Sequence, residues 1–455
     1  EIAYGLLSVV GCTGSVPVIR CPKGGAPEMV ARKLNKLIAE HPSTNTNKAQ
    51  HNRPLLVLLD RTMDLMTPLQ HSSTYQALMD DLLDHKANRV EFTIATEGAR
   101  PVAKKFDLDA NDDPFYVNYK FQPFPEAIEA NGAELEDVTV RENAIRSKTT
   151  TGEGGNPEMM GGAGGSVVHD DGTNAASDLA SAVDSLPKLL EQKKQLEMHT
   201  SILQAVMNEV AARDVPQFYE LESALASGQY KSDPAKAKSE VLSLVTDAAK
   251  GNVEDKIRLI IVFCLATTAP GSDVTEVSNA MAQALESRGS TMNNNGAGGA
   301  SHGLLSKEDR TKLEKGLNAI EYLKNLRSLQ MIPNISADAD DSATGGGAGA
   351  GPDMLSTFMT RATNQATGLL AKATEKVSTM LGKISKHRAT RVVENLCDMK
   401  PNSEDDEYLY LDPRVKGDVD VTMLKSRSMA RTSHREVICF VIGGGCYAEY
   451  QNLQM

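Results

Sequence analysis

The chain has 455 residues, a formal net charge of −12 and a pI near 5.4. A compact domain holds about 100 to 150 residues, so at least two cores are expected. The acidic balance excludes a chain-wide nucleic-acid footprint, which needs clustered Lys and Arg. The six cysteines show no C-x-x-C spacing, which indicates a reducing compartment and predicts neither disulfides nor a zinc site.

Residues 1–75 have the pattern of an α/β domain. Residues 26–40 form a helical pattern, and the apolar run at 55–59 suits a parallel strand that is buried on both faces. A helical period follows from Ser72 to Lys86. The chain opens on Glu1 without a starting Met or a charged leader, which predicts that it begins inside a domain. No run approaches the roughly 20 apolar residues of a membrane-spanning helix, so a soluble protein is expected.

Residues 76–394 are predicted to be a mainly helical insertion. After a polar linker, Phe124-Pro-Glu126 opens a helix with a thin apolar stripe. Residues 149–178 are rich in Gly, Thr and Ser, which predicts a flexible tip. A second helix is expected to start at Ser185-Leu-Pro187. Together the two helices predict a protruding helical hairpin, the arm, over residues 123–212.

Residues 334–386 combine a Gly-rich and Ala-rich loop with an amphipathic helical pattern. At 100° per residue, the apolar side chains of residues 354–384 fall on one side, and a basic edge lies beside a weakly charged polar face. Such a face resembles helices that lie in a membrane interface, and docking on the protein itself is the alternative. The residues expected on this lid or membrane helix are Leu355, Phe358, Met359, Leu369, Leu370, Lys372, Lys376, Val377, Met380 and Leu381.

Residues 395–455 return to the α/β pattern, which predicts a split parallel-sheet domain interrupted by the helical insertion. The strand at 437–442 precedes Gly443-Gly-Gly445, which formally matches the G-x-G-x-x-A turn that holds a pyrophosphate. A glycine-rich turn also occurs wherever the backbone must bend sharply between a strand and a helix. Both interpretations of the turn stay open.

Charged residues follow the strand at 55–59. Asp60, Arg61 and Asp64 stand where α/β enzymes keep acids for metals or proton transfer. Because Arg61 supplies a cation, we expect it to pair with Asp64 while Asp60 caps a turn. His199 has no motif partner inside the arm, so a packed or solvated role is expected. No H-E-x-x-H, G-x-S-x-G or Walker pattern occurs, so no catalytic, metal or cofactor site is predicted.

Several motifs together resemble the Sec/Munc family of vesicle-fusion proteins, and within it the Sly branch that serves endoplasmic reticulum to Golgi traffic. The match runs over nearly the whole chain. The residues that carry it are Gly25-Ala-Pro-Glu-Met-Val-Ala31, Arg53-Pro-Leu-Leu-Val-Leu-Leu-Asp-Arg61, Thr74-Tyr-Gln-Ala-Leu78, Ser185-Leu-Pro187, Tyr408-Leu-Tyr-Leu-Asp-Pro413 and Val441-Ile-Gly-Gly-Gly445.

The resemblance implies a SNARE-assembly chaperone without catalytic activity. Such a protein is recruited by a syntaxin, holds SNARE helices on its arm, and works in the cytoplasm at endoplasmic reticulum, Golgi or vesicle membranes. It uses no cofactor, nucleic acid or small-molecule substrate. In this family the glycine turn is structural, and residues 334–384 correspond to a loop and lid helix. The family also has an N-terminal domain, which is expected to be absent from this sequence. The arm residues expected to contact SNAREs, with packing inside the arm as the alternative, are Leu189, Lys193, Leu196, Met198, Ile202 and Met207.

Two other functions stay open from the sequence. A nucleotide-binding α/β enzyme with a helical accessory domain would carry an acid about 20 residues past the glycines. A membrane-tethering scaffold would act mainly through the amphipathic helix at 354–384.

Overall fold

A computed structural model describes residues 1–40, 53–94, 101–151, 172–291, 305–329, 386–398, 407–415 and 434–454. The described residues divide into two compact units. The first unit is built from those of Glu1–Gln70, Glu220–Asp341 and Lys383–Met455, and the second from those of His71–Tyr219. Within the described residues, no helix is both long enough and apolar enough to cross a membrane.

A four-stranded sheet organises one part of the first unit. Its strands are β1 (Val18–Pro22), β2 (Leu55–Asp60), β6 (Tyr408–Leu411) and β7 (Val437–Ile442), in the order β6-β1-β2-β7. β2 is parallel to both β1 and β7, whereas β6 is an antiparallel edge strand. The strands come from both ends of the chain, so the predicted split parallel-sheet domain is confirmed. The antiparallel edge strand was not predicted.

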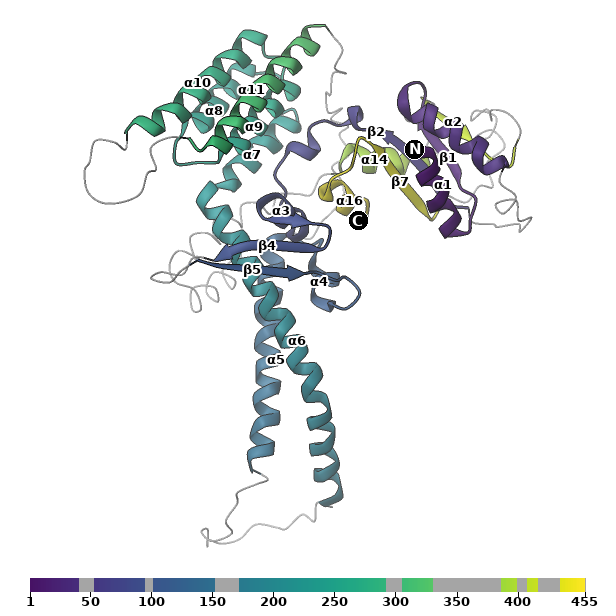
Figure 1. Ribbon diagram of the computed structural model, residues 1–455, viewed down its shortest axis with the longest axis vertical. Helices are drawn as coiled ribbons and strands as arrows, with labels where there is room; N and C mark the ends of the chain where they lie inside the picture. The colour runs from purple at the N-terminus through teal and green to yellow at the C-terminus, as the bar shows by residue number, and fades with distance from the viewer. Residues whose placement is uncertain are drawn as a thin grey trace. The chain divides into compact units, whose positions relative to one another are not determined.

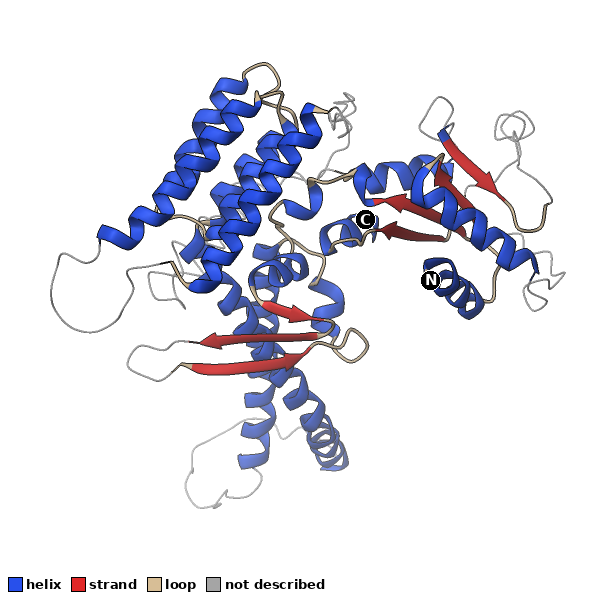
Figure 2. Ribbon diagram, turned by 45° about the horizontal axis from the view of Figure 1, so that its top comes forward, coloured by secondary structure: helices blue, strands red, loops and turns tan. Residues whose placement is uncertain are grey.

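Helices cover both faces of this sheet (Figure 2). Leu56 and Leu58 of β2 face a cluster that includes residues of α1 (Ile2–Thr13) and α2 (Gly25–Glu40). Leu55, Val57 and Leu59 face the opposite cluster, which includes residues of α14 (Arg388–Asp398) and packs against Leu453 of α16 (Tyr447–Gln454). Because both sides of β2 are covered, its sequence is a continuous apolar run instead of an alternating one.

The end of the predicted insertion needs a correction. The boundary expected between residues 394 and 395 falls inside α14, which lies against the sheet. The apolar side of this helix, Ala389, Val392, Val393 and Leu396, is buried in the same cluster as β2. Residues 388–394 therefore pack with the α/β part of the chain.

A group of helices forms the remaining part of the first unit (Figure 1). It contains α8 (Pro234–Thr246), α9 (Val253–Ala266), α10 (Gly271–Thr291) and α11 (Lys307–Ser328), and both α9 and α10 contact the other three. The helix α9 lies inside the stretch that was predicted to be mainly helical. It is buried along nearly its whole length, and a capping box between the side chains of Asn252 and Asp255 starts it.

The second unit begins with α3 (Tyr75–Leu82) and continues into a small sheet. The strands β3 (Asp84–Lys86), β4 (Arg89–Ile94) and β5 (Val102–Asp107) form a three-stranded antiparallel sheet. A short helix, α4 (Pro114–Tyr119), follows it. The predicted polar linker over this stretch is therefore wrong. Ion pairs cover the outer side of the sheet, Arg89 with Asp107 and Glu91 with Lys105, which explains why the strands look like a polar linker.

Two long helices complete the second unit as a hairpin. They are α5 (Phe124–Thr151) and α6 (Gly172–Arg213), which run side by side (Figure 1). The predicted helical hairpin is confirmed, but the predicted start of its second helix at Ser185 is wrong. Pro187 lies inside α6, where it removes one backbone donor without ending the helix.

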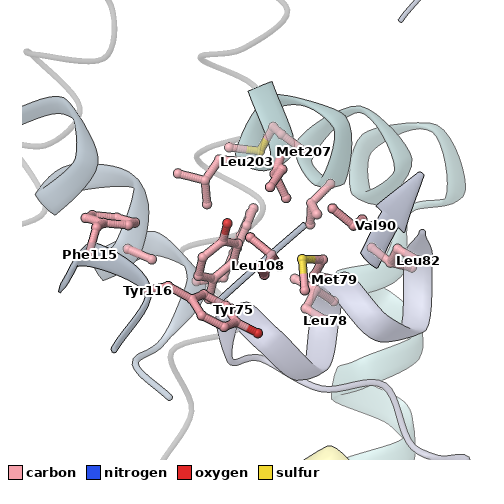
Figure 3. Packing of buried hydrophobic residues seen from close by; sticks show 14 of the residues in the cluster. Tyr75, Leu78, Met79, Leu82, Val90, Leu108, Phe115, Tyr116, Leu203 and Met207 are labelled. Carbon is pink, nitrogen blue, oxygen red and sulfur yellow. The ribbon is translucent and has the colours of Figure 1, made fainter. Parts of the chain in front are cut away.

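An aliphatic and aromatic core joins the hairpin to the rest of the second unit (Figure 3). Tyr75, Leu78 and Met79 of α3 lie close to Leu203 and Met207 of α6. β4, α4 and α5 contribute further members of this core: Val90, Phe115, Tyr116, Phe124, Ala127 and Val138. The part of α6 from Leu196 to Val210, called the root, is thus anchored on several sides.

Candidate functional site

The structure places three of the six predicted arm residues inside the core. Leu196, Ile202 and Met207 have relative exposures of 1%, 0% and 3%. Their apolar side chains pack in the cluster that holds α6 against α3, β4 and α5. In this conformation they cannot form a contact surface for a partner. For these three residues the structure supports packing inside the protein, the alternative to SNARE contact.

The other three predicted residues lie at the edge of that core. Leu189 and Met198 are partly buried and pack against the same cluster. Lys193 is also partly buried, and its Nζ donates to Glu142 Oε2 of α5 at 2.7 Å. The predicted lid and membrane residues between Leu355 and Leu381 lie outside the described residues, so the structure says nothing of them.

The part of α6 from Ser185 to Gln195, called the upper arm, exposes a different set of side chains. Leu190 is 40% exposed, Leu186 is half-buried one turn before it, and Lys194 is exposed one turn after it. Residues four apart share one side of a helix. We call Leu186, Leu190, Lys193 and Lys194 the arm strip, because helical spacing puts them on one side of α6. The exposed Glu197 follows on the same side.

A buried carboxylate links the two helices of the arm. Glu142 of α5 accepts from Lys193 across the hairpin and from Arg146 at 2.6 Å along its own helix. The side chain of Glu142 is only 6% exposed. The hydrogen bond from Lys193 and the charges of both cations hold the pKa of Glu142 below its usual range. The Glu142 to Arg146 spacing was visible in the sequence, but the pairing with Lys193 requires the fold.

A second polar contact lies closer to the root. Asn131 Nδ2 donates to the carbonyl oxygen of Leu196 at 3.0 Å, and Thr200 Oγ1 donates to Asn131 Oδ1 at 2.8 Å. Asn131 is buried, so an altered alignment of α5 on α6 would leave its amide unsatisfied. This contact therefore fixes the register of the hairpin, as single buried Asn residues do in coiled coils.

The sequence predicted a packed or solvated His199, and the structure shows that it is packed. His199 is fully buried in the root, with Nδ1 at 2.8 Å from Tyr75 Oη and Nε2 at 2.8 Å from Asp113 Oδ2. The rings of Phe115 and Tyr116 lie beside the imidazole. Burial opposes ionisation of Asp113, but hydrogen bonds from His199 and from backbone amides hold its pKa below the usual range. This network ties α6 to the starts of α3 and α4.

The charged residues after β2 stabilise the local structure through a cap, an ion pair and turn hydrogen bonds. Asp60 caps the 3₁₀ turn η2 (Arg61–Met63) by accepting from the Thr62 amide, as expected. The expected side-chain pair of Arg61 with Asp64 is wrong. Arg61 instead forms a bidentate pair with Glu449 of α16, at 2.8 and 2.7 Å. Asp64 accepts from the residues that follow it, at the start of η3 (Thr67–Leu69).

The glycine turn packs against the same ion pair. Gly443 has a φ of +105°, and a Cβ there would stand 2.7 Å from Arg61 Cβ, so both the backbone angle and the close approach require glycine. Glu449 accepts from the Cys446 amide at 3.2 Å at the start of α16. That position is where a dinucleotide fingerprint would place a phosphate. A carboxylate already present there repels a pyrophosphate, which argues against the nucleotide interpretation.

The model of the Sec1 family matches residues 1–455. The chain belongs to the Sec1 family. This match confirms the Sec/Munc resemblance that the sequence motifs indicated. The Protein sly1 homolog of Drosophila melanogaster is 33% identical to the chain and aligns with all of it. The alignment covers 64% of that relative, so the chain spans less than two thirds of its length.

Two solved structures share the fold. One is Sly1p in complex with an N-terminal peptide of Sed5p, with a TM-score of 0.60 and 24% identity over 100% of this chain and 61% of the other. The second is the SM protein Vps45 in complex with the Qa SNARE Tlg2, with a TM-score of 0.56 and 15% identity over 99% of this chain and 63% of the other. At these identities the likeness establishes the SM fold of this chain.

Proposed function

We propose that the chain is a SNARE-binding chaperone that promotes SNARE complex assembly in endoplasmic reticulum to Golgi transport. The observation that carries the proposal is the family match over all 455 residues, together with the similarity to a sly1 homolog. The two structural neighbours were solved with a Sed5p peptide and with a Qa SNARE. Syntaxin-type SNAREs are therefore the partners we propose for this chain.

The upper arm supports binding of a helix as the working step. SNARE motifs are amphipathic helices when assembled, and such helices dock through side chains at i, i+3 and i+4. The arm strip offers Leu186 and Leu190 for the apolar side of a partner, and Lys193 and Lys194 for acidic side chains. This set replaces the buried residues of the original prediction. The proposed action needs no bond-making step, in keeping with a non-enzymatic protein at the surface of endoplasmic reticulum and Golgi membranes.

The test measures SNARE assembly by fluorescence transfer between labelled cytosolic SNARE fragments, with and without the full 455-residue chain. The wild-type chain is expected to bind the syntaxin-type fragment and to accelerate assembly. Leu190→Asp should remove most of the acceleration, because it places a charge in the apolar part of the arm strip. Leu190 is 40% exposed, so the substitution leaves the core intact.

The matched control is Tyr322→Asp, which puts the same charge on an exposed apolar position of α11, 63% exposed and far from the arm in sequence. It should assemble SNAREs at the wild-type rate. Absence of SNARE binding by the wild-type chain would overturn the proposed function. Equal loss in both variants would overturn the role of the upper arm.

A further inference from the structure

Three charged side chains meet at the middle of the arm. Glu142 is one carboxylate held between two cations, Lys193 of α6 and Arg146 of α5. Lys193 is 27% exposed and Arg146 is 63% exposed, whereas Glu142 is 6% exposed. The anion is therefore inside and the two cations reach the surface. An ammonium carries three donors, and one of those of Lys193 is directed at Glu142.

The acidic and basic neighbours of this cluster are arranged differently. On α5, Asp137 pairs with Arg141 at 2.7 Å, and both side chains are more than half exposed. On α6, Glu191 and Lys194 are exposed, and Leu190 exposes its side chain one turn before Lys194. Glu142 is thus the buried acid of this region, and the apolar part of the arm strip lies next to the lysine that Glu142 holds.

We propose that Glu142 occupies the place of a partner's carboxylate on Lys193 and Arg146, and that this competition selects the partner. This proposal rests on the proposed function. The favoured partner is an amphipathic SNARE helix with an acidic side chain about one turn from apolar ones, so that its apolar side meets Leu186 and Leu190 while its carboxylate reaches Lys193. A helix without that acid gains nothing from the cations and leaves Glu142 in place.

The physical basis is an exchange of partners. Lys193 and Arg146 keep Glu142 ionised inside the hairpin, because a buried carboxylate without cations is strongly unfavourable. A second carboxylate at the surface shares the same cations, and it is attracted by their charge and repelled by that of Glu142. Removing the charge of Glu142 while keeping its shape should therefore strengthen binding of the acidic partner.

The experiment compares Glu142→Gln with Asp137→Asn in the full chain. Both substitutions remove one negative charge from α5 and keep the side-chain shape, but the Asp137 pair is exposed and on the same helix only. The probe is a fluorescent syntaxin-type SNARE-motif fragment, followed by anisotropy. E142Q should lower Kd by about two- to fivefold at low salt, the range that partly exposed charge pairs contribute. The gain over D137N should shrink at 0.5 M salt.

Lys193→Met tests the other half of the pair. It should weaken binding of the probe, and the double variant with E142Q should bind no better than Lys193→Met alone, because the gain acts through that lysine. Glu142→Asp keeps the charge but retracts the carboxylate from Lys193 by one methylene. It should fall between wild type and E142Q, and it carries the test if E142Q loses helical circular dichroism.

The outcomes separate the two proposals. Binding of the probe by wild type with E142Q equal to or weaker than D137N overturns the competition and leaves the proposed function standing. A gain from E142Q that persists in the Lys193→Met background also overturns it. Failure of every variant and of wild type to bind any SNARE fragment overturns the proposed function itself.

Discussion

The Arg61–Glu449 ion pair connects residues 388 positions apart and closes the split α/β part of the chain. Arg61 follows β2 and Glu449 lies in α16, with side-chain exposures of 17% and 3%. We consider Arg61→Met, which keeps the apolar stem of the side chain and removes the guanidinium. Glu449 then keeps the Cys446 amide as a donor and loses both hydrogen bonds from arginine.

The expected loss follows from the burial of Glu449. Removing one member of a buried ion pair costs about 3–5 kcal/mol, because the remaining charge stays in a poorly solvated place. Arg61 is partly exposed and Glu449 keeps the amide and the thiol of Cys446 as donors, so we expect the lower end, about 3 kcal/mol. For a unit of this size each kcal/mol lowers Tm by roughly 2–4 °C, which predicts a drop of about 6–12 °C. The double variant Arg61→Met with Glu449→Leu removes the stranded charge and should recover most of the loss.

Urea denaturation followed by circular dichroism measures the free energy, and calorimetry measures Tm. The matched control is Lys312→Met, which breaks the more exposed pair of Lys312 with Glu254 in the same unit and should cost less than about 1 kcal/mol. A loss in Arg61→Met no larger than in the control would refute the reasoning. So would a double variant as unstable as the single one, because the cost would then not come from the stranded Glu449.

Two more predictions concern packing and pH. Gly316→Ala places a Cβ 2.3 Å from Ile257 Cδ1 and within 3 Å of both of its γ carbons, so overpacking of about 1–3 kcal/mol should exceed the gain of about 1 kcal/mol in helix propensity. Ile257→Ala removes all three contacting carbons, so in denaturation experiments it should cost less stability in the Gly316→Ala background than in the wild-type chain. The lowered pKa of Asp113 stabilises the fold above the usual Asp pKa of about 4, and this contribution is lost as pH falls through the lower folded value. Plots of Tm against pH should therefore fall less steeply below pH 4 for Asp113→Asn than for wild type, and equal slopes would show that ionisation of Asp113 does not contribute to stability.

The parts of the fold that the sequence predicted are those with strong local patterns. The apolar runs of β2 and β7 predict strands, and the structure buries β2 while β7 stays partly exposed at the edge of the described sheet. The sheet β3-β4-β5 was missed because ion pairs cover its outer side, so its strands have no continuous apolar signal. The Gly443 turn was found, but its partner Arg61 is close only after both halves of the chain come together.

The candidate site on the arm was predicted only in part. Helical periodicity marks the side of α6 that is apolar, and it cannot tell whether that side meets the same chain or a partner. Leu196, Ile202 and Met207 satisfy the period and are buried in the core. Leu190 satisfies it less well and is exposed. Glu142 carried no signal beyond an i, i+4 pair with Arg146, because its partner Lys193 comes from the other helix.

The two parts of α6 have different environments, which indicates that they have different roles. The root is surrounded by α3, β4 and α5, and the fully buried His199 fixes it to Tyr75 and Asp113 through two hydrogen bonds of 2.8 Å. The upper arm has α5 beside it and exposes Leu190 and Lys194 of the arm strip. A surface that binds another helix must present apolar groups without losing its own shape. A rigid root supplies that shape, so substitutions in the root should change stability, and substitutions of the exposed Leu190 and Lys194 in the upper arm should change partner binding at constant stability.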